Sequence, residues 1–364
     1  MTDNKNINNK ERVFLITVGD VKTKRWELLQ SLEELASLTR TAGGEVVESF
    51  IQMRDRYNPA LLLGRGKVEE LSRIAAVLKI DLLIFDTELS AAQIRNLEEI
   101  TKIRVIDRTT LILDIFAKHA RTKEAKLQVE MAQLEYRLSR LVGKGLQLSR
   151  LGGGIGTRGP GEKKLEVDRR RIKERISILK RELKKIELSK QIQRKRRHNF
   201  HKVCIVGYTN AGKSSLVNSL TRGNLLTADY LFSTLDSNTS LLFLPPNYRI
   251  LISDTVGFLK NLPHSLIASF RATLAEVLEA DLLIHIVDAS DSDIDAKLET
   301  VQTVLSEIGA EGKPRILVFN KLDRIFREEK LRLIEKFPEA LFVSATEGTG
   351  INELKEYLKN YFFP

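Results

Sequence analysis

Short hydrophobic runs alternate with amphipathic stretches through the first 120 residues of the chain. Four runs, VFLITV, VVESFI, DLLIFD and RVID, have the length and composition of strands and occupy residues 13–18, 46–51, 81–86 and 104–107. The stretches between them carry apolar residues at helical spacing. This alternation predicts a small parallel α/β domain over residues 1–120, in which no group of residues indicates a reaction.

The hydrophobic spacing changes to four and three residues in turn between residues 121 and 199. Two sets of positions share this heptad spacing: Leu127, Met131, Leu134, Leu138 and Leu141, and then Ile172, Ile176, Leu179, Leu183 and Ile186. The glycine-rich stretch LGGGIGTRGPGE (151–162) lies between them. The chain must reverse at the glycines if the two seams are to meet. The pattern therefore predicts a long antiparallel helical hairpin, with arms of roughly 35–50 Å.

The glycine-rich stretch partly matches two phosphate-binding templates, but its neighbours argue against both. A phosphate loop follows a strand, whereas a helix enters this stretch, and Glu162 stands where a Walker A lysine would be. One interpretation is an ordinary turn between helices. The other is a functional tip whose exposed backbone approaches another molecule closely. Turns between helices usually take about 2–8 residues, and this longer stretch favours the functional tip.

Positive charge is concentrated in the same region. The chain has a net charge of +11, but residues 121–202 contain 25 Lys and Arg against 9 Asp and Glu, a net +16, which leaves −5 for the remainder. A segment this basic repels itself unless it meets a polyanion. We therefore expect a polyanionic partner such as RNA.

Cysteine content and hydropathy indicate the compartment. Cys204 is the only cysteine and lies in an apolar run, so we expect a buried thiol in a reducing environment. No apolar stretch reaches the roughly 18–20 residues of a membrane span. The N-terminal stretch lacks the apolar core of a signal peptide. These features predict a cytoplasmic protein with no membrane span.

Residues 200–364 return to alternating strand and helix patterns and carry a phosphate-binding motif. In HKVCIVGYTNAGKSSLVNSL, a strand (203–206) leads into a complete Walker A sequence and then a helix. Backbone N–H groups of such a loop cradle the α- and β-phosphates. Lys213 can reach the β- and γ-phosphates, and the Ser214 hydroxyl can bind Mg²⁺.

Two further sequences supply contacts to the metal and the γ-phosphate. Asp254-x-x-Gly257 follows the strand RILIS; its carboxylate suits a contact to Mg²⁺ through water, and the Gly257 N–H can bind the γ-phosphate. Thr234, in LFSTLD, lies where a mobile loop could bring a hydroxyl to the metal. Phe258 follows Gly257 where many GTPases have a glutamine that orients the attacking water. Intrinsic hydrolysis should therefore be slow.

The base-reading sequence is NKLD (320–323), which follows the strand ILVF. The carboxylate of Asp323 only accepts hydrogen bonds, and guanine offers it two adjacent donors where adenine offers an acceptor. Ser344 and Ala345, after LFV, can complete the pocket for the base. Four motifs in this order, each at the end of a strand, predict a guanine-nucleotide-binding domain over residues 200–364.

The candidate residues form three groups. The candidate catalytic residues are Lys213, Thr234 and Gly257, and the candidate Mg²⁺ ligands are Ser214, Thr234 and Asp254. The candidate residues that bind GTP or GDP are Gly207, Tyr208, Thr209, Asn210, Ala211, Gly212, Lys213, Ser214, Ser215, Phe232, Ser233, Thr234, Leu235, Asp236, Asp254, Thr255, Val256, Gly257, Asn320, Lys321, Leu322, Asp323, Phe342, Val343, Ser344 and Ala345.

Together these sequences resemble the HflX family of translational GTPases, over essentially the whole chain past residue 12. The matching sequences are LGRGKVEEL, ELSAAQIRNLE, DRTTLILDIFAKHARTKEAKLQVEMAQLEY, GGGIGTRGPGEKKLE, GYTNAGKSSL, FSTLD, DTVGF and NKLD. The segment from Asp107 to Glu162 is the most specific, because GTPases at large do not share it. One departure is LDSNTS (235–240), where the family more often has proline and arginine.

The resemblance implies a P-loop GTPase domain, preceded by the small parallel α/β domain and the helical hairpin. It also implies binding of the large ribosomal subunit and its ribosomal RNA, with ribosome splitting or rescue under stress. The glycine-rich tip would then approach the peptidyl-transferase region, and Phe258 fits a family with a hydrophobic residue at the glutamine position. Some relatives are said to bind ATP in the N-terminal domain, but this one has no Walker A motif there.

Two functions from different classes remain open at the level of sequence. The first is a ribosome-stimulated GTPase, expected to be a monomer, whose arm acts on ribosomal RNA. The second is a GTP-regulated RNA-binding or ribosome-assembly scaffold factor, in which hydrolysis only resets binding. A tRNA-modifying GTPase is disfavoured because the sequence shows no folate or cysteine chemistry.

Overall fold

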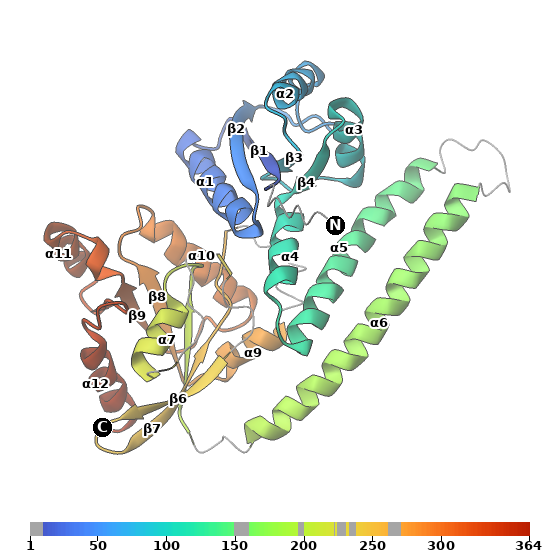
Figure 1. The fold of residues 1–364 in the computed structure, drawn as a ribbon. Helices are drawn as coiled ribbons and strands as arrows, with labels where there is room; N and C mark the ends of the chain where they lie inside the picture. The colour runs from blue at the N-terminus through green and yellow to red at the C-terminus, as the bar shows by residue number, and fades with distance from the viewer. Residues whose placement is uncertain are drawn as a thin grey trace, which may run out of the picture. The chain divides into compact units, whose positions relative to one another are not determined.

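The structure, a computed structural model, describes residues 10–148, 160–195, 200–221, 223, 231–232, 238–260 and 271–364 (Figure 1). The chain divides into two compact units. The first unit contains residues 1–118 and 130–179, and the second contains residues 119–129 and 180–364. The division into three domains at residues 120 and 199 stays a prediction.

The first unit contains a four-stranded parallel sheet in the order β2-β1-β3-β4. Its strands are β1 (Arg12–Asp20), β2 (Glu45–Arg54), β3 (Leu82–Phe85) and β4 (Arg104–Asp107), and its helices are α1 (Arg25–Ala42), α2 (Arg65–Val77), α3 (Ala91–Thr101) and α4 (Arg108–His119). Each predicted hydrophobic run is a strand. Parallel strands need crossover connections, and the helices between the runs provide them.

Local sequence explains where these helices begin and end. Ser90 and Gln93 form a capping box at the start of α3, in which each side chain accepts a hydrogen bond from the other residue's backbone N–H. Helix α1 ends at Gly43, whose φ of +94° suits a residue without a Cβ. Between the elements, Phe14 and Ile16 of β1 pack with Leu71 and Ala75 of α2 in one apolar core.

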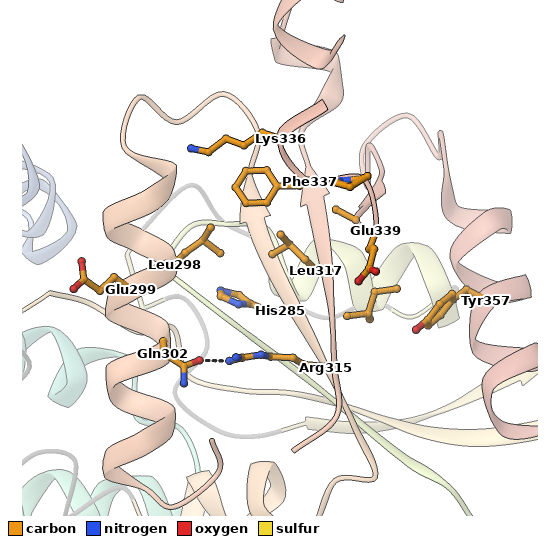
Figure 2. A pocket seen from close by; sticks show the side chains of 13 residues that line it. His285, Leu298, Glu299, Gln302, Arg315, Leu317, Lys336, Phe337, Glu339 and Tyr357 are labelled. Atoms are coloured by element: carbon orange, nitrogen blue, oxygen red, sulfur yellow. Dashed lines mark hydrogen bonds between the residues drawn. The ribbon is translucent and has the colours of Figure 1, made fainter. Parts of the chain in front are cut away.

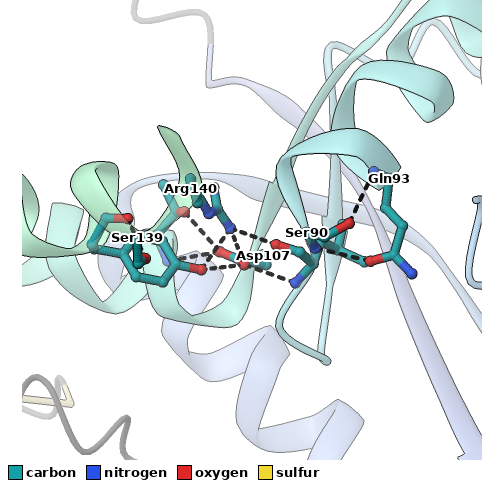
Figure 3. A network of polar contacts seen from close by, with 8 residues as sticks. Ser90, Gln93, Asp107, Ser139 and Arg140 are labelled. Atoms are coloured by element: carbon teal, nitrogen blue, oxygen red, sulfur yellow. Dashed lines mark hydrogen bonds and ion pairs between the residues drawn. The ribbon is translucent and has the colours of Figure 1, made fainter. Parts of the chain in front are cut away.

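Asp107 is the centre of a buried polar network at the junction of β4 and α4 (Figure 3). Its carboxylate, 0% exposed, accepts hydrogen bonds from the Leu89 N–H at 3.1 Å and the Tyr136 hydroxyl at 2.5 Å, and it pairs with Arg140. The Arg140 guanidinium also lies 4.2 Å from the Tyr136 ring centroid. Burial, and then the charge of Asp107, raise the pKa of Tyr136, so its hydroxyl remains a donor. The network therefore ties helix α5 to the end of the sheet.

A second buried charge lies beside the first. Arg108 is 3% exposed and pairs with Glu34 and with Asp86, the latter at 2.7 Å. Burial alone would lower the pKa of Arg108, but its two acidic partners outweigh burial and raise it. Asp86 also accepts a hydrogen bond from Ser31 at 2.5 Å. Two oppositely charged neighbours offset the cost of burying the guanidinium.

The two long helices of the basic region are α5 (Lys123–Leu148) and α6 (Pro160–Lys195), of 26 and 36 residues. Their alignment is antiparallel, because Arg175 pairs with Glu130 at 2.7 Å and Lys123 with Glu182 at 3.9 Å. The predicted seam positions are buried or half-buried: Leu127, Met131, Leu134, Leu138, Leu141, Ile172, Ile176, Leu179, Leu183 and Ile186. The helical hairpin is therefore present.

The predicted tip lies largely outside the described residues, which resume at residue 160. Helix α6 begins at Pro160, so the last three residues assigned to the tip are helical. Proline fits the first position of a helix, where its missing N–H would have no intrahelical partner. The extent of the tip over residues 151–162 stays a prediction, and its last three residues, 160–162, are described as helical.

The second unit contains a six-stranded sheet in the order β10-β9-β8-β5-β7-β6. Its strands are β5 (Lys202–Gly207), β6 (Asn238–Leu244), β7 (Tyr248–Asp254), β8 (Leu282–Asp288), β9 (Arg315–Asn320) and β10 (Leu341–Phe342). All neighbours are parallel except the edge strand β6, which pairs with β7 in the antiparallel sense. Its helices are α7 (Lys213–Thr221), α9 (Arg271–Glu279), α10 (Ile294–Glu307), the short η1 (Leu322–Arg324), α11 (Arg327–Lys336) and α12 (Ile351–Phe362).

Alternating side chains of β5 point into two different cores. Val203 and Ile205 pack with residues of α7 and α12 on one face of the sheet. Cys204 and Val206 pack with residues of α9 and α10 on the other. Cys204 is buried, as predicted, and burial raises the pKa of its thiol. Within the described ranges, no helix combines the length and the apolar character that crossing a membrane requires.

Replacing Asp107 with alanine should destabilise the first unit by about 3–5 kcal/mol, because it leaves the buried partners of the carboxylate unsatisfied. Tyr136→Phe should cost less, about 1–3 kcal/mol, since it removes the two hydrogen bonds of the hydroxyl, to Asp107 and from Arg140, and keeps the ring. Urea denaturation would measure the change in stability of both variants. Amide hydrogen exchange of residues 130–140 in the folded proteins would measure the protection of α5. Unchanged protection of α5 in the Asp107→Ala variant would show that the network does not hold this helix.

Candidate nucleotide-binding site

The Walker A loop joins β5 to α7 and encloses the head of Lys213. The Lys213 ammonium donates hydrogen bonds to the carbonyl oxygens of Gly207 at 3.3 Å and Tyr208 at 2.8 Å. Burial lowers the pKa of Lys213 to about 8, a shift that Asp254 opposes. The loop carbonyls fix the direction of the ammonium, which has one further hydrogen to donate.

Two positions of this loop require glycine, because atoms of neighbouring strands approach the loop backbone too closely to leave room for a Cβ. A Cβ on Gly207 would clash with the carbonyl oxygen of Ile286 in the neighbouring strand β8. A Cβ on Gly212 would clash with the side-chain amide of Asn320, and Gly212 also has a φ of +92°. The loop therefore packs directly on the strands beneath it, as the spacing of a Walker A sequence demands.

Asn320, at the end of β9, connects the phosphate loop to the predicted base loop. Its amide group donates to the carbonyl oxygen of Ala211 at 3.0 Å, and its side-chain oxygen accepts from the Ala345 N–H at 3.0 Å. The side chain is 2% exposed. One buried amide thus fixes the distance between two loops that are 134 positions apart along the chain.

Asp323 and Ser344 lie together, as the base-reading prediction requires. The Ser344 hydroxyl donates to the Asp323 carboxylate at 2.5 Å. Lys321, beside them, pairs at 2.7 Å with Asp288, the last residue of β8. Asp288 was not among the candidate residues, although its position at the carboxyl end of the strand next to β9 could have identified this ion pair.

The predicted metal ligands at the ends of β7 and α7 also converge. The Ser214 hydroxyl donates to the Asp254 carboxylate at 2.5 Å, so two oxygen ligands of the kind that Mg²⁺ prefers lie side by side. The next residue, Thr255, donates to the carbonyl oxygen of Ile205 at 2.6 Å and so fixes the turn after Asp254. Groups of three or more His, Cys, Asp or Glu that could hold a metal are absent from the residues described.

Phe258, which follows Gly257, pairs with the phosphate loop through its backbone. The Phe258 N–H donates to the Gly207 carbonyl oxygen at 3.1 Å, and the Thr209 N–H donates to the Phe258 carbonyl oxygen at 2.8 Å. The Phe258 ring is 2% exposed and packs with Cys204, Val206 and other core residues. The aromatic side chain is therefore structural, and it points into the core.

The remaining candidate residues fall into three groups. Side chains that are buried are Tyr208, Thr209, Ala211, Phe232, Val256 and Val343; those that are half-buried are Ser215, Leu322 and Phe342; and Asn210 is exposed. Phe342 stacks on Phe319 in a core cluster, and Val343 is 0% exposed, so both positions serve the core. The residues outside the described ranges are Ser233, Thr234, Leu235 and Asp236.

A cavity of about 870 Å³ lies elsewhere in the second unit and includes none of the candidate residues (Figure 2). It is lined by His285 of β8, Leu298 of α10, Arg315 of β9 and Phe337, among others. Burial lowers the pKa of His285 to about 4, with a further lowering by Arg315, so its imidazole is neutral at physiological pH. The sequence analysis gave no sign of this cavity, because its walls come from elements distant in the chain.

Comparison with known proteins gives matches along the chain. Three family models match in succession: "GTP-binding GTPase N-terminal" at residues 29–117, "GTP-binding GTPase Middle Region" at residues 119–197, and "50S ribosome-binding GTPase" at residues 202–321. Among solved structures, the crystal structure of the complex of SsGBP and GDP is 28% identical, with a TM-score of 0.52, and the match covers 96% of this chain and 98% of that one.

Curated relatives are more similar in sequence. GTPase HflX of Escherichia coli (strain K12) is 42% identical, over 91% of this chain and 78% of the relative. GTPase HflX of Caldanaerobacter subterraneus subsp. tengcongensis is 45% identical over 361 residues, which are 98% of this chain and 81% of the relative. With this identity over nearly its whole length, the chain belongs to the HflX family of GTPases.

Proposed function

We propose that this GTP hydrolase binds GTP and Mg²⁺ at the carboxyl edge of the second sheet and works mainly on the large ribosomal subunit. The observation that carries the nucleotide site is the position of Asn320, which joins the phosphate loop to the loop beside Asp323. In parallel α/β sheets, ligands bind at the carboxyl ends of the strands, where these loops meet.

The candidate catalytic residues, the candidate metal ligands and Asp323 have the following roles in this proposal. Lys213 binds the β- and γ-phosphates, and Asp323 accepts the two hydrogen bonds of the guanine edge. Ser214, Thr234 and Asp254 hold Mg²⁺, directly or through water, and Gly257 donates its N–H to the γ-phosphate. When bound, Mg²⁺ supplies charge neutralisation on the phosphates. The close pairing of Ser214 with Asp254 supports the metal assignment.

The large ribosomal subunit is the partner that best fits the charge of the chain. The family model over residues 202–321 is described as a 50S ribosome-binding GTPase. Helix α6 presents exposed basic side chains, Arg169, Arg170, Arg171 and Lys173 among them. Lys and Arg at this density favour a phosphate backbone, which ribosomal RNA provides in the cytoplasm. In this proposal, the helical hairpin and its tip act on stalled ribosomes to split or rescue them.

Asp323→Asn should weaken GTP binding by about 2–4 kcal/mol, because a charged acceptor for two donors is lost. Titration with a fluorescent GTP analogue would measure the change. Xanthosine triphosphate is the matched control ligand, since its 2-oxo group can accept from the new amide, and its affinity should rise. If the wild-type protein and the Asp323→Asn variant bound GTP with equal affinity, this result would contradict the role of Asp323.

Free enzyme should turn over GTP at roughly 10⁻⁴–10⁻² s⁻¹, the range of GTPases that lack activation in trans, because Phe258 cannot orient water. Purified 50S subunits should raise this rate substantially, and Lys213→Ala should abolish it. A phosphate-release assay with and without subunits would measure both rates. A rate above about 1 s⁻¹ that subunits leave unchanged would exclude ribosome stimulation.

Affinity for ribosomal RNA should fall by about 10³–10⁵ between about 50 and 200 mM salt, if six to ten phosphates are neutralised. Only Arg158 and Glu162 are charged within residues 151–162, so the tip adds little to this binding. Replacing residues 152–161 by a short Gly-Ser turn should keep subunit binding and remove splitting. Co-sedimentation and subunit dissociation would be measured on the same variant.

The matched control reverses charge on the arm and keeps the tip, as in an Arg170→Glu, Arg171→Glu, Lys173→Glu variant. This variant should lose binding. Intact splitting in the tip-replaced variant would reduce the tip to a simple turn. Intact binding in the charge-reversed variant would instead favour a scaffold that binds RNA by another surface.

A further inference from the structure

Tyr208, the second residue of the Walker A sequence, links the phosphate loop to the segment that follows Gly257. Its hydroxyl accepts a hydrogen bond from the Lys260 N–H at 2.9 Å. Tyr208 is one of the candidate nucleotide-binding residues, but this hydroxyl contacts the protein backbone two residues after Phe258. The side chain therefore has a task within the protein itself.

Hydrogen bonds join the phosphate loop to both ends of residues 258–260. The Phe258 N–H donates to the Gly207 carbonyl oxygen at 3.1 Å, and the Phe258 carbonyl oxygen accepts from the Thr209 N–H at 2.8 Å. The tyrosine hydroxyl adds its bond at the far end of the segment, and this bond depends on a side chain. Gly257, the proposed donor to the γ-phosphate, directly precedes the segment, so the loop restrains the backbone on the carboxyl side of the glycine.

The ring of Tyr208 is itself held in place, which gives its hydroxyl a fixed position. The residue is 9% exposed. The Lys297 ammonium of α10 lies 5.0 Å from the ring centroid and pairs with the Asp291 carboxylate. A cation is attracted to the electron-rich face of a tyrosine ring. The acceptor for Lys260 is therefore anchored by α10 as well as by the phosphate loop.

Gly257 depends on its neighbours for the direction of its N–H, because glycine has more backbone freedom than any other residue. No larger residue fits here, since a Cβ would lie 2.8 Å from the Thr209 Cα atom and 2.9 Å from the Lys213 Nζ atom. On the amino side of the glycine, the Thr255 hydroxyl donates to the Ile205 carbonyl oxygen at 2.6 Å. The tyrosine hydroxyl supplies the corresponding restraint on the carboxyl side.

We infer that Tyr208 is a positioning residue for GTP hydrolysis: its hydroxyl holds the segment after Gly257 so that the glycine N–H is directed at the γ-phosphate. This inference rests on the proposed nucleotide site. The Tyr208 carbonyl oxygen has a separate task, since it accepts a hydrogen bond from the Lys213 ammonium at 2.8 Å. A change confined to the phenol hydroxyl therefore leaves that contact of Lys213 in place.

Tyr208→Phe keeps the ring and the carbonyl oxygen and removes the acceptor for Lys260. Its single-turnover hydrolysis rate at saturating GTP should fall about 3- to 10-fold, with and without 50S subunits, as expected for the loss of one neutral hydrogen bond. Its affinity for GDP, which lacks the γ-phosphate, should stay within about twofold of wild type. Amide hydrogen exchange of residues 256–260, measured with a bound non-hydrolysable GTP analogue, should become faster.

Tyr248→Phe is the matched control, because it makes the same chemical change at the end of β7 opposite to Asp254. It should leave the hydrolysis rate and the exchange of residues 256–260 unchanged. A wild-type or higher rate in Tyr208→Phe would overturn the inference, and so would unchanged exchange in that variant. A loss of GDP affinity as large as the loss of rate would indicate general damage to the phosphate loop and would also overturn it. Failure of the wild-type protein to bind GDP would instead refute the proposed nucleotide site itself.

Discussion

The second unit depends on the side-chain amide of Asn320. This buried group bonds to the carbonyl oxygen of Ala211 and to the N–H of Ala345, so it joins two loops that are distant in the sequence. The Asn320 amide can make both hydrogen bonds only when both loops are in place. A buried amide that lacks one of its hydrogen bonds lowers the stability of the fold. Gly212 has to be glycine for the same reason, since the amide occupies the space of a Cβ. Asn320 therefore holds the phosphate loop, the base loop and the end of β9 together as one structural unit.

The first unit shows the same use of a buried polar group at a strand end. Asp107 closes β4 and bonds to Tyr136 and Arg140 of α5. The arm helix is thereby attached to the sheet by directional contacts that apolar packing alone would not provide. In both units, a polar side chain at the carboxyl end of a parallel strand, Asp107 or Asn320, fixes the position of the neighbouring helix or loops.

Sequence periodicity predicted the strands and the long helices well, because burial on one face imposes spacing on the sequence. The runs at 13–18 and 104–107 are strands, and the heptad positions from Leu127 to Ile186 are buried or half-buried. Motifs predicted that Lys213 and Asp323 follow the strands β5 and β9 and that Asp254 lies at the end of β7. Contacts between distant side chains were not predictable, because no local pattern records them. The pairing of Asp107 with Arg140, the burial of Phe258 and the cavity at His285 are of this kind.

The enclosure of Cys204 has a practical consequence for spectroscopy. The chain has a single cysteine, it is 1% exposed, and burial raises the pKa of its thiol, so little reactive thiolate forms at neutral pH. Maleimide dyes should leave the folded wild-type chain unlabelled. One engineered surface cysteine on α6 would then accept a single fluorophore without removal of the native residue. The natural sequence is therefore a ready background for following the arm by the emission or anisotropy of one dye.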